Sequence, residues 1–342
     1  MLLDNFPPAE IIAAAPDALA LALGEHVSAP HPLASALAER PLSGLAEACS
    51  RLAQRPGTPV RAQYYTTHHF DTAFAAGVQA LVTRRFTAQA EHRRFCGELV
   101  LRDYKPADFP EFDMPDELSV TGELNEFGYQ FVGEENSEKV IERLENVRLN
   151  TFGRLLYISR QMVKNDDIGL VANIIGGLGN AGARTEARLL YQGLNLNPVM
   201  LDGERVFVPG KNIIDGPLDE TNLSAGMTMM RRFQTPVGNP ADLSARHLVV
   251  AAELELPALK LTHQLGLNIT VTATPLLPAQ RWFLFSDPEQ HAACVTLKLA
   301  GSTTAVMIER ATSFKDDSHV LRARADLGAR IMGRMGAVRG GE

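Results

Sequence analysis

Residues 157–191, YISRQMVKNDDIGLVANIIGGLGNAGARTEARLLY, decide the fold of this chain. They predict a short strand that ends near Ser159, a polar break at 164–167 and a long helix over 165–193. Asn165 or Asp166 can accept hydrogen bonds from the free N–H groups of the first turn, which is typical of a helix start. Apolar residues then follow mostly three or four apart, as on one helix face: Ile168, Val171, Ile175, Leu178 and Leu189.

A stripe of small residues runs beside this apolar face. Because small side chains let another backbone approach closely, the stripe predicts tight packing against a sheet or a neighbouring subunit. Its members are Gly169, Ala172, Gly176, Gly179, Ala183 and Ala187.

The same glycines permit a second interpretation. Gly177, Gly179 and Gly182 form a GxGxxG pattern, which a strand over 171–175 would precede and Asp202 would follow. This is the order of parts in a dinucleotide-binding unit, whose acidic residue about 20 positions on binds the ribose. Inside a helix, each glycine costs about 1 kcal/mol relative to alanine. Local physics leaves both interpretations open.

The composition is that of an ordinary globular protein. The chain has 342 residues, 45% hydrophobic and 21% charged, enough for two domains and a sizeable core. Its three cysteines, Cys49, Cys96 and Cys294, are odd in number and widely spaced, which favours free thiols over a disulfide framework or a zinc site. No apolar run approaches the roughly 20 residues that cross a bilayer, and we expect no signal peptide and no membrane partner.

Charge is distributed unevenly. Residues 108–145 hold twelve acidic residues against Lys139 and Arg143, a local balance of −10, whereas the whole chain carries −7. The remainder is therefore +3, so the acidic segment and the basic patches elsewhere could meet within the fold or between copies. Solvated faces are the simpler explanation. Nucleic-acid binding of the usual kind is disfavoured, because phosphate contact needs a concentrated basic face.

Periodicity predicts an α+β chain. A helix is expected from Thr66 or Thr67 to about Gln89, and the segment from about 98 to 158 is expected to form an extended hairpin that needs a partner to cover it. Further helices are expected at 223–233 and 257–265. Strands are expected at 98–104, 118–124, 129–132, 147–159, 248–252, 268–273, 282–285, 295–299, 305–310 and 321–325. A dinucleotide-binding domain would instead need repeated strand–helix units.

Catalytic motifs are not found. The chain has no GxSxG, HExxH or Walker-type pattern, and no carboxylate pair stands out by its spacing. His68 and His69 resemble metal ligands, but neighbours on a helix point about 100° apart, so they cannot easily share an ion. We therefore predict neither an enzyme nor a cofactor or metal site.

Several separated segments resemble a known family. TFGRLLYISRQMVKNDDIG (151–169), the glycine-containing helix and NPVMLDGERVFVPGKN (197–212) resemble major capsid proteins of tailed bacteriophages, nearest to the Mu-like major head subunit group. That group includes versions fused behind a ClpP-like prohead protease. TTHHFDTAF (66–74), WFLFSDP (282–288) and DLGARIMGRMGAVRG (326–340) also resemble family segments. The chain departs from the family pattern at His68-His69 and at Met332-Gly333.

The resemblance implies a tailed-phage major capsid protein fold. The expected parts are an N-terminal arm (1–66), a helix leading into the extended loop (67–97), the extended loop hairpin (98–158), a peripheral domain with the spine helix (159–216 and 293–342) and an axial domain (217–292). The implied function is self-assembly into hexamers and pentamers of an icosahedral head shell around double-stranded DNA. Implied partners are a scaffold or prohead protease, a portal and decoration proteins, with assembly in the bacterial host cytoplasm and a final location in the virion.

The resemblance and the charge pattern together suggest inter-subunit contacts. We expect the acidic loop of one copy to meet basic residues of the next. The candidate contact residues are Glu123, Glu126, Glu134, Glu135, Arg84, Arg85, Arg93, Arg94 and Arg310. The alternatives are a dinucleotide-binding oxidoreductase built on the GxGxxG at 177–182 and an encapsulin-like compartment of the same fold.

Overall fold

The computed structural model describes residues 73–110, 144–159, 168–200, 203–235, 239–312 and 318–341, with 10, 13–14, 17–18, 21, 27 and 29–38 near the start. The chain divides into two compact units. Unit 1 comprises Met1–Ala90, Thr151–Thr185 and Ser302–Asp326, and unit 2 comprises Glu91–Asn150, Glu186–Gly301 and Leu327–Glu342.

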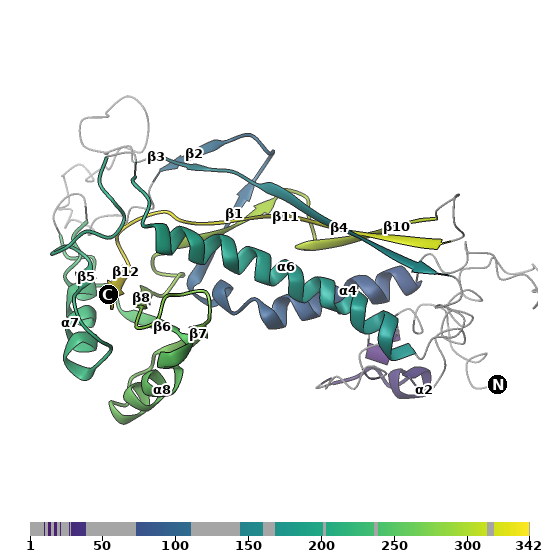
Figure 1. The fold of residues 1–342 in the computed structure, drawn as a ribbon, viewed down its shortest axis with the longest axis horizontal. Coiled ribbons are helices and arrows are strands. Elements are labelled where there is room, and N and C mark those ends of the chain that lie inside the picture. The colour runs from purple at the N-terminus through teal and green to yellow at the C-terminus, as the bar shows by residue number, and fades with distance from the viewer. Residues whose placement is uncertain are drawn as a thin grey trace, which may run out of the picture. The chain divides into compact units, whose positions relative to one another are not determined.

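Two helices pack together in unit 1. They are α4 (Ala73–Gln89) and the first part of α6 (Ile168–Leu196), which Figure 1 shows alongside each other. Gly179 of α6 lies against the backbone of Val82 and Phe86 of α4, and a Cβ at Gly179 would collide with the carbonyl oxygen of Val82. At Gly179 the small-residue stripe therefore makes a close helix–helix contact within the chain.

Three strands complete the described part of unit 1. β4 (Asn150–Ser159) pairs with β11 (Ser318–Ile331), and β11 pairs antiparallel with β10 (Val306–Thr312). Gln79 of α4 fixes the helix to β10, because its side-chain amide donates to the carbonyl of Val306 at 2.6 Å and accepts from the N–H of Ile308 at 2.9 Å.

A short helix lies near the start of the chain. Ala34 and Leu37 of α2 (Ala34–Ala38) pack against Ala14 and Ala18 in a small apolar cluster of their own.

The larger sheet of unit 2 has both faces buried. Its strand order is β5-β12-β8-β6-β7, with β12 and β6 antiparallel to β8. The strands are β5 (Ile213–Ile214), β12 (Ala337–Gly340), β8 (Trp282–Ser286), β6 (Ala245–Ala251) and β7 (Thr270–Thr274). Every residue of β8 is buried. This confirms the predicted buried strand at 282–285.

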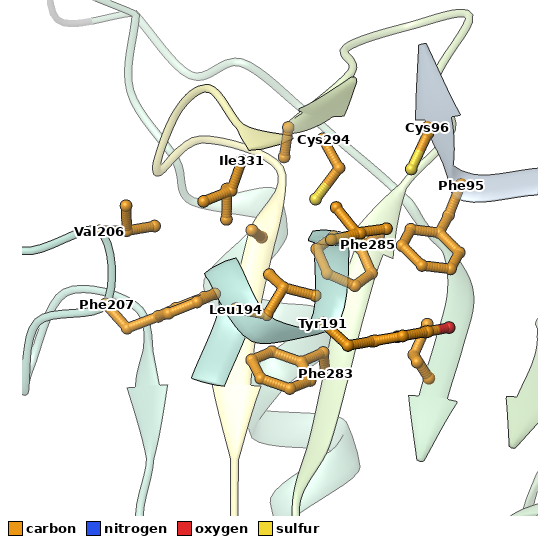
Figure 2. Close-up of a cluster of buried hydrophobic side chains, with 14 of the residues drawn as sticks. Phe95, Cys96, Tyr191, Leu194, Val206, Phe207, Phe283, Phe285, Cys294 and Ile331 are labelled. Atoms are coloured by element: carbon orange, nitrogen blue, oxygen red, sulfur yellow. The ribbon is translucent and has the colours of Figure 1, made fainter. Parts of the chain in front are cut away.

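Alternation along β8 divides the core into two layers. Phe283 and Phe285 point into one layer, where Tyr191 and Leu194 of α6 pack, as Figure 2 shows. The other layer holds Trp282 and Leu284 under α7 and α8. The bounds of these helices are Glu220–Arg231 for α7 and Glu255–Gln264 for α8, and the 3₁₀ turn η4 (Ala252–Leu254) precedes α8.

The end of α6 is fixed by Asn197. This residue takes a left-handed conformation (φ 47°), which stops the helix after Leu196. Its side-chain oxygen accepts from the N–H of Phe207 at 2.7 Å and its amide nitrogen donates to the carbonyl of Phe207 at 2.9 Å. The chain after α6 is thereby held against the helix end.

A second group of strands in unit 2 begins the predicted hairpin. The 3₁₀ helix η2 (Glu91–Phe95) leads into β1 (Cys96–Leu101), which pairs parallel with β9 (Cys294–Leu299). The last residues of β11 pair with β9. β2 (Ala107–Pro110) pairs antiparallel with β3 (Leu144–Val147), so the two ends of the predicted loop run side by side.

The dinucleotide interpretation is wrong. It needs a strand over 171–175 and a turn at the glycines, but α6 is one continuous helix from Ile168 to Leu196. Gly177, Gly179 and Gly182 are interior helical residues. Their cost in helix propensity is offset at Gly179 by the close approach of α4, which no larger residue would permit.

The remaining predicted elements have mixed outcomes. Helices were confirmed near 223–233 and 257–265, and the strands at 268–273, 295–299, 305–310 and 321–325 were confirmed with shifted ends. The predicted strand at 147–159 is two strands, β3 and β4, and β12 was not predicted. The predicted strands at 118–124 and 129–132, the start of the first helix and His68 and His69 lie outside the described residues.

Candidate assembly site

The predicted contact arginines begin on α4. Arg85 donates from Nη1 to the side-chain oxygen of Asn173 at 2.8 Å and to its backbone carbonyl at 3.3 Å, so it bridges α4 and α6 within unit 1. Arg84 is one residue earlier and half-buried. Arg85 thus has a partner within its own unit.

Arg93 belongs to a buried charge cluster of unit 2. Its Nε and Nη2 atoms donate to the two carboxylate oxygens of Glu186 at 2.7 and 2.8 Å. Nε2 of His92 lies 2.8 Å from the same carboxylate. We call His92, Arg93 and Glu186 the buried cluster. It joins α6 to the turn η2 from which β1 departs.

The buried cluster controls the ionisation of Glu186. Burial alone would raise the pKa of this carboxyl, but hydrogen bonds from Arg93 and His92 and their charges outweigh it, so the pKa is lowered. For Arg93, burial alone would lower the pKa, but the pairing with Glu186 outweighs it and the pKa is raised. Both shifts favour the charged pair.

The other described candidates are Arg94 and Arg310. Arg94 is exposed and lies 3.6 Å from Glu91, one helical turn away. Arg310 lies on β10 opposite Leu321. The four acidic candidates lie outside the described residues: Glu123, Glu126, Glu134 and Glu135. The predicted acid–arginine contacts between copies therefore stay a prediction, because none of the acidic partners is among the described residues.

Sequence reasoning missed Glu186 as a partner, although a signal was present. The buried positions of α6 recur every three or four residues, at Ile175, Gly179 and Ala183 and, beyond Glu186, at Leu190 and Leu194. Glu186 falls on the same stripe and is fully buried. An acidic residue on a buried helix face requires a paired cation.

The described residues contain neither a metal-binding group nor a membrane-spanning helix. No group of three or more His, Cys, Asp or Glu side chains within them is arranged to hold a metal ion. None of the helices in this part of the chain has the length and apolar character to cross a membrane.

The mixed α+β architecture, with the long helix α6 and its sheets, is the fold of phage major capsid proteins. The chain belongs to the phage capsid protein family, whose model matches residues 144–340. No curated protein sequence matches the chain.

Solved structures agree on the fold. A phage-related protein from Bordetella bronchiseptica RB50 aligns with a TM-score of 0.52 and 10% identity, over 76% of this chain and 95% of that chain. A virus-like particle from Pyrococcus furiosus aligns with a TM-score of 0.50 and 10% identity, over 79% of this chain and 100% of that chain. At such identities the likeness concerns the fold alone.

Proposed function

We propose that this chain is the major shell subunit of a phage head, and that identical copies assemble as hexamers and pentamers into an icosahedral shell around double-stranded DNA. The family match over 144–340 carries the proposal. The role is structural and requires no catalytic step or cofactor. The net charge of −7 suits a wall that encloses DNA without sequence-specific binding, because a strongly cationic wall would bind the DNA phosphates.

Exposed apolar residues support a role in assembly. Leu256 and Leu259 lie three residues apart on α8, share one face and are 60% and 47% exposed. On β4, Leu155 and Tyr157 are two apart, so they share one face of the strand, and they are 53% and 60% exposed. Large contiguous apolar patches mark surfaces that another chain covers, and we propose these two neighbouring pairs as parts of such a surface.

The finer assignments stay proposals. They are the Mu-like subgroup, the division into arm, extended loop, peripheral and axial domains, the scaffold or protease, portal and decoration partners, and assembly in the bacterial cytoplasm. The antiparallel pair of β2 and β3 supports the extended loop, because it places residues 107–110 beside 144–147 at the base of a hairpin.

Electron microscopy and size measurement of the purified protein test the function. We expect closed particles, or pentamers and hexamers, when the chain is produced alone or with its neighbouring genes. A monomer that stays monomeric at high concentration under both conditions would refute the shell.

Charge reversal tests the loop contact. Arg94→Glu and Arg310→Glu should each impair assembly, and Glu134→Arg with Glu135→Arg should partly restore it. Arg93 is unsuitable, because its reversal would break the pair with Glu186 inside the subunit. Unchanged assembly of both single variants would refute the contact.

A further inference from the structure

Two arginines lie side by side on the larger sheet of unit 2. β12 and β8 are antiparallel, with Arg339 opposite Phe283 and Gly340 opposite Trp282. Arg281 immediately precedes β8, two residues before Phe283. It is therefore the diagonal neighbour of Arg339 on the same sheet face, within reach for long side chains. We call Arg281 and Arg339 the arginine pair.

Close backbone packing fixes this end of the sheet. Gly341 has a φ of 79°, and a Cβ there would lie 3.0 Å from Cα of Arg281 and would collide with the carbonyl oxygen of Gln280. A Cβ at Gly340 would collide with the ring of Trp282. The strand that carries Arg339 therefore cannot move away from Arg281 without losing these contacts.

The arginine pair forms no ion pair among the described residues. The Nε atom of each guanidinium is buried and has no hydrogen-bond partner there, and no described carboxylate forms an ion pair with either. Arg339 stacks over the ring of Phe207, with 5.8 Å from its Cζ to the ring centroid. Stacking orients a guanidinium group but leaves its charge uncompensated.

The pKa shifts of both arginines agree with a partly buried pair of like charges. Burial lowers the pKa of Arg281. Burial also lowers the pKa of Arg339, the nearby charge of Arg281 lowers it further, and Asp215 only partly opposes both. Two like charges held together and partly desolvated are unfavourable until an anion joins them.

We propose that the arginine pair is a receptor for a carboxylate supplied by a second copy of the chain, an inference that rests on the proposed function. The guanidinium fork matches a carboxylate and can donate two parallel hydrogen bonds to it. Acidic residues are plentiful in each copy, because the chain holds 40 of them against 33 lysines and arginines. Twelve of the acidic residues fall within 108–145.

An assembly assay tests the receptor. The double variant Arg281→Gln/Arg339→Gln should raise the subunit concentration needed for particle formation about tenfold, because charge-assisted hydrogen bonds between copies are lost. Arg232→Gln, an exposed arginine at the end of α7, is the matched control and should assemble like wild type. Wild-type particles together with an unchanged double variant would overturn the receptor alone, whereas a wild type without particles would refute the proposed function.

The melting temperature of the unassembled subunit separates this role from an internal one. Arg281→Gln removes one charge of the pair and keeps the stacking of Arg339 on Phe207, so it should leave the melting temperature unchanged or raise it. A fall in melting temperature would show that the arginine pair stabilises its own chain and would overturn the proposal.

Chemical coupling identifies the source of the anion. Arg339→Lys keeps the charge and provides an amine, which a carbodiimide joins to a contacting carboxylate as an amide, the reagent taking up the water that is lost. Particles assembled from mixed ¹⁴N and ¹⁵N subunits of the Arg339→Lys variant should contain cross-linked peptides. In these, position 339 of a light chain is joined to a carboxylate of a heavy chain, or the reverse. Links only within chains of one label would overturn the proposal. Loss of co-purified nucleic acid from the double variant, with assembly unchanged, would assign the site to phosphate instead and also overturn it.

Discussion

His92 and Glu186 face each other inside unit 2, with 2.8 Å between Nε2 and Oε2 and side-chain exposures of 1% and 0%. Arg93, the neighbour of His92, binds the same carboxylate through two nitrogens. The three side chains join α6 to the turn that leads into β1. Because a buried carboxylate needs its cation, this contact holds the turn η2 against α6.

Glu186→Ala should lower the free energy of unfolding by about 3 kcal/mol, because it leaves the cationic side of the buried cluster without its carboxylate. Urea denaturation of the unassembled subunit measures the change. Arg231→Ala is the matched control, since it removes an exposed ion pair with Asp242. The control should cost less than about 1 kcal/mol, and equal losses for the two variants would contradict the role of the buried cluster.

The helix that carries Glu186 was predictable from the sequence, but its partners were not. The pattern from Ile168 onward predicts a long helix, and the structure has one over Ile168–Leu196. Local sequence cannot predict that His92 and Arg93, more than ninety residues away, meet Glu186, because this contact depends on tertiary packing. The predicted role of Arg93 between subunits remains untested.

The unpredicted strand β12 shows the same limit. Residues 337–340 read AVRG, too short and too rich in glycine and arginine for a strand pattern. Pairing with β8 and β5 makes the segment a strand, and Val338 is buried there. The arginine pair could not be found from the sequence for that reason. The larger outline, an α+β capsid fold, came from separated motifs in the correct order.

Stability should depend on pH through His291. Burial lowers the pKa of His291 to about 4, and a hydrogen bond with the Met335 backbone only partly opposes this. Between about pH 6.5 and 4 the unfolded chain binds a proton that the folded protein does not. The contribution of neutral His291 to the free energy of unfolding is complete above pH 6.5. It is lost as the pH falls to 4, a change on the order of 3 kcal/mol.

His291→Gln should flatten this pH dependence, measured by urea denaturation at several pH values between 4 and 7. His263→Gln, at an exposed residue of α8, is the matched control for the exchange of a histidine for glutamine. Glu186 titrates in a lower window, since its pKa is lowered and its contribution is lost only as the pH falls below the usual range of a carboxyl. An unchanged slope in His291→Gln would contradict the assignment.

Cys96 and Cys294 should resist alkylation in the folded subunit. They lie opposite each other on β1 and β9 and are 8% and 0% exposed. Burial, together with the neighbouring Cys294, raises the pKa of Cys96 well above its usual value, so little thiolate is present. In a Cys49→Ser background, iodoacetamide should label them at least about a hundredfold more slowly than the urea-unfolded chain, as mass spectrometry would show.

Gln264→Cys supplies the control for this labelling. The residue is exposed at the end of α8, so its thiol should react at the rate of an unfolded cysteine. Rapid native labelling of Cys96 would mean that β1 separates from β9 readily, contrary to the packing described.

Two glycines of α6 should respond in opposite directions to substitution by alanine. Gly177→Ala should raise the free energy of unfolding by up to about 1 kcal/mol, because alanine favours the helix and no atom lies within 4 Å of the new Cβ. Gly179→Ala should lower it by about 1–3 kcal/mol, because its Cβ would meet the Val82 backbone, which cannot rotate away as a side chain can. Urea denaturation of both variants provides the comparison, each being the control of the other. If the two substitutions stabilised the subunit equally, α4 would not pack on α6 as closely as described, and the small-residue stripe would need a different partner.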